Sequence, residues 1–81
     1  MVTTKEDVVK AIAKLGPTME RALTQHPEKH PSLEHSWAVL MEEVKELEQE
    51  VYRKRKNRRA LLDEALDVAF TALRMIADNE L

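Results

Sequence analysis

The chain has 81 residues, of which 43% are hydrophobic and 35% are charged, so its length leaves room for one small domain. It contains no cysteine, which excludes disulfide frameworks, thiolate zinc sites and cysteine nucleophiles and predicts a reducing, cytoplasmic location. The formal net charge of -2 gives no overall attraction to nucleic acid, and we expect neither a nucleic-acid nor a membrane partner. Because a core of this size contributes only a few kcal/mol, we expect oligomerisation or a bound metal as further support.

Few residues that favour turns are present, and the composition predicts an all-α chain. A capping pattern at Thr4 and apolar residues at helical spacing predict N-terminal helices over about residues 4–25. Gly16-Pro17 should end or kink the first of them. Two prolines in the segment HPEKHP predict a loop over residues 26–31.

Two long core helices are predicted after this loop. Ser32 is a good N-cap for the first, which should extend to about residue 54 with one apolar stripe at near-heptad spacing. The basic segment RKRKNRR, residues 53–59, then leads into a second helix over about residues 58–78 that is apolar around most of its circumference. Such a helix must be buried on several sides, so we predict an antiparallel helical bundle completed by homo-oligomerisation.

Each core helix carries a pair of carboxylates three residues apart. Glu43 and Glu46 border the apolar stripe of the first, and Glu64 and Asp67 lie in the only polar strip of the second. If the helices are antiparallel neighbours, the two pairs can face one another. Converging carboxylates repel unless cations neutralise them, and oxygen ligands at this spacing suit Mg2+ or Mn2+. The alternative interpretation is a solvated surface of salt-bridged side chains.

The two acidic segments carry a family resemblance. Glu42-Glu43-Val44-Lys45-Glu46, seventeen further residues and then Glu64-Ala65-Leu66-Asp67 resemble the E-E-x-x-E and E-x-x-D motif pair of the MazG-like all-α nucleoside triphosphate pyrophosphohydrolases. The surrounding HSWAVLMEEVKELEQEV is most similar to small members found in phages and prophages, and the resemblance covers about residues 32–79. It implies a cytoplasmic, metal-binding hydrolase that works as a homodimer or tetramer.

The resemblance also implies roles for individual residues. Glu43, Glu46, Glu64 and Asp67 match the Mg2+ ligands of the family. Metal-assisted hydrolysis would convert an NTP or dNTP to its monophosphate and pyrophosphate. Either Glu46 or Glu50 is a candidate to orient the attacking water, and the sequence does not choose between them.

Basic residues are candidates for binding the triphosphate. Lys54 and Arg58 belong to the basic segment, and Arg74 shares the polar strip of Glu64 and Asp67. The competing interpretation of the segment is a solvated turn between helices.

Two further features bear on function. The three histidines in and around the proline loop have irregular spacing, so we expect solvent-exposed or capping groups and no zinc site. The chain ends directly after the last predicted helix, where many relatives carry another basic segment. This departure leaves a second interpretation open, namely a non-catalytic helical dimer on the same scaffold that acts as an interaction or regulatory module.

Overall fold

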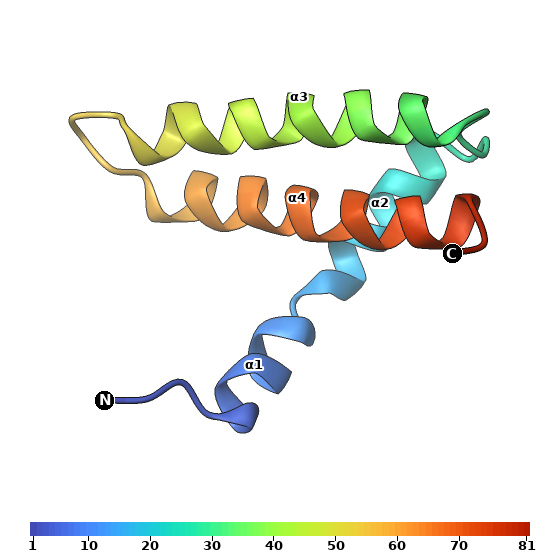
Figure 1. Cartoon of the computed structure of the whole chain (residues 1–81). Coiled ribbons are helices and arrows are strands. Elements are labelled where there is room, and N and C mark those ends of the chain that lie inside the picture. The colour runs from blue at the N-terminus through green and yellow to red at the C-terminus, as the bar shows by residue number, and fades with distance from the viewer.

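The computed structural model describes all of residues 1–81 and contains only helices (Figure 1). In chain order these are α1 (Lys5–Ile12), α2 (Leu15–Gln25), α3 (Leu33–Val51) and α4 (Arg58–Asp78). The all-α prediction is confirmed. None of these helices has the length and apolar character needed to cross a membrane.

The break between the two N-terminal helices lies a few residues nearer the N-terminus than the sequence predicts. Thr4 caps α1 through a capping box with Asp7, in which each side chain bonds the backbone N–H of the other. The helix ends at Ile12, and Gly16-Pro17 lies in the first turn of α2. Proline is tolerated there because the first N–H groups of a helix have no partner within the helix. The expectation of a break at Gly16-Pro17 was therefore wrong by a few residues.

Helices α3 and α4 form an antiparallel hairpin (Figure 1). Ser32 caps α3 as predicted, and Asn57 caps α4 by accepting a hydrogen bond from the Ala60 N–H. Helix α3 ends at Val51 and does not continue to residue 54. Successive like charges in the basic segment disfavour further helix, and Lys56 Nζ instead donates to the carbonyl oxygen of Val51.

A buried polar network ties the proline loop to the end of α4. Ser36 is fully buried, with its Oγ 2.9 Å from His30 Nδ1 and 3.0 Å from Asn79 Nδ2, which donates to it. The His30 backbone N–H and Arg74 Nε both donate to Asp78 Oδ2, at 3.0 Å and 3.1 Å. Two of these contacts, His30 with Asp78 and Ser36 with Asn79, join residues more than forty positions apart and so fix the loop and the start of α3 against the end of α4.

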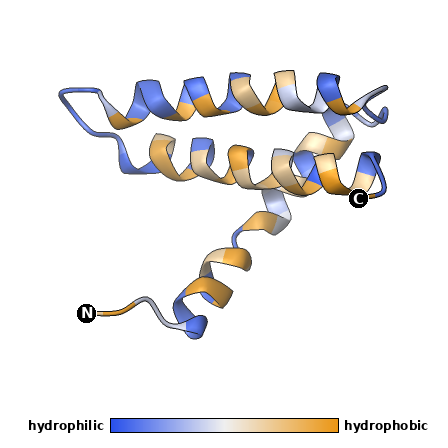
Figure 2. Cartoon of the chain, in the orientation of Figure 1, coloured by the Kyte–Doolittle hydropathy of each residue, from blue (hydrophilic) through white to orange (hydrophobic).

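The apolar core of a single chain is small. Phe70 is the only buried hydrophobic residue, and α1 projects away from the hairpin (Figure 1). Hydrophobic positions lie between α3 and α4, and others lie on α1, away from this interface (Figure 2). Large apolar side chains remain exposed on all four helices, including Ile12, Leu23, Trp37 and Ile76.

Candidate metal centre

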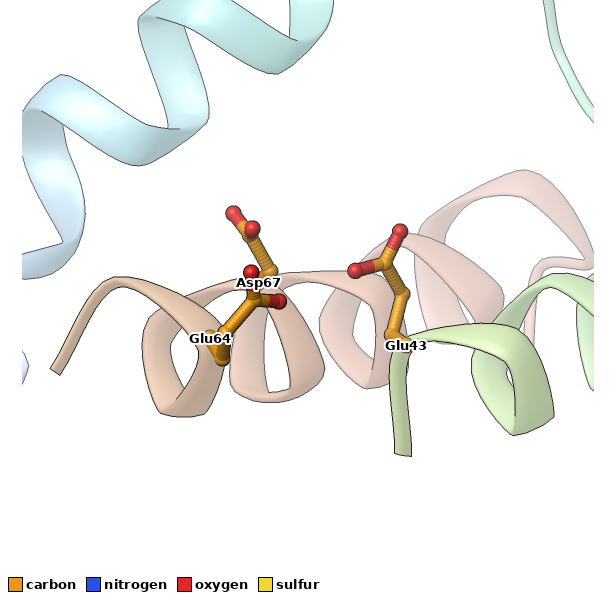
Figure 3. Close-up of side chains that lie close together, drawn as sticks. All are labelled: Glu43, Glu64 and Asp67. Atoms are coloured by element: carbon orange, nitrogen blue, oxygen red, sulfur yellow. The ribbon is translucent and has the colours of Figure 1, made fainter. Parts of the chain in front are cut away.

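Three carboxylates from the two helices of the hairpin converge on one point. One oxygen of each of Glu43, Glu64 and Asp67 lies within 4.8 Å of the others, a separation at which one cation can contact all three. Glu43 comes from α3 and faces the two residues of α4 (Figure 3). The antiparallel pairing brings the two acidic segments opposite one another, and the spacing of three residues places Glu64 and Asp67 on one face of α4.

The cluster shifts the proton affinity of all three acids. Burial, followed by repulsion from Glu46, Asp67 and Glu64, raises the pKa of Glu43 to about 7. Burial and the neighbouring carboxylates also raise the pKa of Glu64. The pKa of Asp67 is raised mainly by burial, although Arg21 partly opposes this shift. It is therefore energetically unfavourable for all three acids to be charged at once, and a bound cation would offset this repulsion.

Two oxygen atoms of the cluster lack hydrogen-bond donors. Glu43 Oε2 and Glu64 Oε2 are inaccessible to solvent, and no N–H or hydroxyl group of the protein donates to them. Buried carboxylate oxygens are costly without a compensating partner. The donor set consists of oxygen alone, so its chemistry fits a hard divalent cation such as Mg2+ or Mn2+.

The two predicted catalytic acids lie beside this group of three. Glu46 is exposed and is not one of the three converging residues, but its charge contributes to the raised pKa values of Glu43 and Glu64. Glu50 lies nearer the basic segment, where its Oε1 is 3.2 Å from Arg53 Nη2, while its buried Oε2 has no hydrogen-bond donor. Its charge also raises the pKa of Glu64, so Glu46 differs from Glu50 in acting on both glutamates and in being open to solvent.

The predicted phosphate-binding residues are not gathered at the cluster. Arg74 is only 8% exposed, and it donates to Asp78 and to the carbonyl oxygen of Glu28. Its guanidinium thus holds the proline loop in place. Lys54 and Arg58 line a separate open hollow formed by the basic segment itself.

An open cleft adjoins the carboxylates. It has a volume of about 800 Å³ and lies between α2, residues 26–31, α3 and α4. Glu43 and Asp67 lie on its wall, together with Arg21, His26, Lys29 and Phe70. Arg21 was not among the residues predicted from the sequence, because it lies on a separate helix 46 residues before Asp67, with which it pairs. All three histidines line this cleft; His26 and His35 are exposed, as predicted, whereas His30 is partly buried.

Comparisons with protein-family models, with characterised proteins and with solved structures find no significant match to this chain.

Proposed function

We propose that this protein is a Mg2+-dependent nucleoside triphosphate pyrophosphohydrolase with a MazG-like fold. It hydrolyses an NTP or dNTP to the monophosphate and pyrophosphate. One observation carries the proposal: Glu43 of one i,i+3 pair meets Glu64 and Asp67, the two members of the other pair, across an antiparallel hairpin, and Glu43 and Asp67 line an open cleft. This is the arrangement that the motif resemblance implies for its metal ligands.

The residues of the cluster have distinct proposed roles. Glu43, Glu64 and Asp67 hold the cation, with Glu46 as an adjacent fourth carboxylate. A bound divalent cation would supply Lewis-acid stabilisation of phosphate oxygens and lower the pKa of a water. The exposed Glu46 orients that water, because it is near enough to raise the pKa values of Glu43 and Glu64 and remains accessible.

The cleft provides space for the nucleotide beside the carboxylates. Arg21, His26 and Lys29 place basic groups on its wall, and these groups suit an anionic phosphate chain. The volume of about 800 Å³ is large enough for a nucleotide.

A second copy of the chain completes the proposed enzyme. Leu73 and Ile76 of α4 are 49% and 50% exposed, and Trp37 at the start of α3 is 56% exposed. A helix with apolar residues around its circumference is stable in water only when its remaining faces are covered. These exposed faces support assembly into a homodimer or tetramer.

The proposal is tested by measuring pyrophosphate release from a panel of nucleoside triphosphates with Mg2+ or Mn2+. We expect release by the wild type and a loss of about 100-fold or more in both Glu46→Gln and Asp67→Asn. Glu48→Gln is the matched control, because Glu48 is an exposed acid of α3 outside the cluster. It should retain the activity of the wild type.

Absence of release by folded, metal-binding wild-type protein would refute catalysis. The non-catalytic helical module would then be the better explanation of the same scaffold.

A further inference from the structure

Arg21 is the basic residue that contacts the carboxylate cluster. Its Nη2 donates to Asp67 Oδ1 at 3.2 Å, across the contact between α2 and α4. The ion pairs of the chain place no other cation on Glu43, Glu64 or Asp67. Arg21 thus already partly neutralises one member of the cluster.

The position of Arg21 also joins the cluster to the cleft. Its side chain is 51% exposed and lines the cleft together with Asp67. A guanidinium has five N–H donors, and only one hydrogen bond uses them here. Arg74, the other arginine on the cleft wall, is buried and bonded to Asp78 and Glu28, so it has no comparable freedom.

A cation at the cluster would weaken the ion pair between Arg21 and Asp67. The cation and the guanidinium compete for Asp67, because both are stabilised by the same carboxylate. A phosphate chain bound beside the cation would offer the planar guanidinium an anionic partner with two oxygen atoms that can accept its hydrogen bonds. The side chain is exposed enough to move from one partner to the other.

We propose that Arg21 is a phosphate-binding residue that exchanges Asp67 for the phosphate chain of the substrate when the metal and nucleotide bind. This inference rests on the proposed function, and it adds a group that the motif pair does not contain. Its consequence is a pair of effects with opposite sign. Removing Arg21 strengthens binding of the free cation and weakens binding of the metal–phosphate complex.

The experiment measures these two affinities separately and needs no hydrolysis. Free Mn2+ binding to the full chain is followed by electron paramagnetic resonance, and binding of Mg2+–tripolyphosphate by titration calorimetry. For Arg21→Gln we expect the Mn2+ dissociation constant to fall about two- to fivefold, because a competing charge is removed. The tripolyphosphate dissociation constant should rise about tenfold with loss of a charge-assisted contact.

Two further variants serve as controls. Arg21→Lys retains the charge but not the planar fork, so its tripolyphosphate affinity should lie between those of the wild type and Arg21→Gln. Lys10→Gln removes one positive charge from the exposed Lys10–Glu6 pair on α1 and should leave both affinities unchanged. Circular dichroism establishes that each variant keeps its helices.

The possible results separate the two proposals. If both affinities of Arg21→Gln fall together, or neither changes, Arg21 is only a structural partner of Asp67 and the inference is wrong. The same conclusion holds if the wild type binds Mn2+ but not Mg2+–tripolyphosphate. If the folded wild type binds neither, the metal centre itself is refuted and the inference is refuted with it.

Discussion

At the scale of single residues, the main feature is a group of acids that the fold brings so close together that charging all of them at once is energetically unfavourable. Glu43 illustrates this, since burial and three neighbouring acids raise its pKa to about 7. Each acid alone is an ordinary helical carboxylate, and only the hairpin makes it part of a site. Predictions about protons and cations therefore depend on individual side chains of this cluster.

The raised pKa of Glu43 predicts a pH dependence of stability. Between the ordinary pKa of a glutamate, 4.5, and about 7, the folded state binds more protons at Glu43 than the unfolded state does. The contribution of protonated Glu43 to the stability of the folded state is therefore complete at low pH and is lost as the pH rises through about 7. Between about pH 5 and pH 8, the melting temperature should therefore fall less in Glu43→Gln than in the wild type. After solvent screening we expect Glu43 to change the free energy of unfolding by about 1 kcal/mol over this range, which corresponds to a difference of about 4–8 °C between the two proteins.

The neighbouring Glu42→Gln is the control for this comparison, because Glu42 is exposed and outside the cluster. The lowered pKa values of His30 and Asp78 also make stability depend on pH, but they do so equally in the wild type and in both variants, so their effect cancels in the comparison. Parallel pH profiles for wild type and Glu43→Gln would contradict the assignment.

Divalent cations should stabilise the folded chain through the same residues. With Mg2+ at about 100 times its dissociation constant, linkage predicts about 2.7 kcal/mol of additional stability. We therefore expect Mg2+ to raise the melting temperature of the wild type at about pH 8. This rise should be lost in Glu64→Gln. The rise should shrink near pH 5, where protons occupy the cluster instead. An equal rise in Glu64→Gln would place the cation elsewhere.

At the scale of elements, the hairpin positions the carboxylates and the proline loop forms one wall of the cleft. The loop is held by the buried Ser36 hydroxyl, which meets His30 Nδ1 and Asn79 Nδ2, and by the contacts of Asp78. Helix α2 is held against α4 in part by the pair between Arg21 and Asp67. Rigid helices thus position the acids, while a loop and a short helix cover them.

Removal of the buried hydroxyl should loosen that loop. Ser36→Ala leaves polar atoms of His30 and Asn79 without their partner, and we expect the free energy of unfolding in urea to fall by about 1–3 kcal/mol. Thr24→Ala removes an exposed hydroxyl that bonds the Glu20 carbonyl oxygen, so it should change stability by less than about 0.5 kcal/mol. Equal effects of the two substitutions would show that the buried network does not stabilise the loop.

The sequence allowed prediction of the elements better than of their long-range contacts. Apolar spacing and the caps at Ser32 and Thr4 identify helices, because these signals are local. The antiparallel pairing of α3 and α4 accounts for the convergence of Glu43, Glu64 and Asp67, whereas Glu46 is not part of that group. The contact of Arg21 with Asp67 did not follow, because the orientation of α2 depends on packing between distant segments, which no local pattern encodes.

At the scale of the whole molecule, the single chain buries too little apolar surface for its length. Only Phe70 among the hydrophobic residues is buried, and large apolar side chains remain exposed along α1 and α4. Small domains without disulfides or cofactors need further support. Association with a second copy would cover these faces.

Oligomerisation is tested by light scattering on the purified chain. We expect a mass of two or four chains at micromolar concentration, and a shift toward monomer together with a lower melting temperature in Ile76→Glu. Val2→Glu, an equally large change at an 83% exposed terminal position, should have little effect. A stable wild-type monomer would contradict the proposed assembly.

We propose that the carboxylate centre cleaves the bond between the α and β phosphates, and a 31P nuclear magnetic resonance time course of the best-hydrolysed nucleoside triphosphate with wild-type protein and Mg2+ tests this. We expect the monophosphate and pyrophosphate signals to grow together and to stop growing when a chelator is added. Formation of diphosphate and orthophosphate, or an unchanged triphosphate spectrum for every nucleotide tried with folded protein, would contradict it.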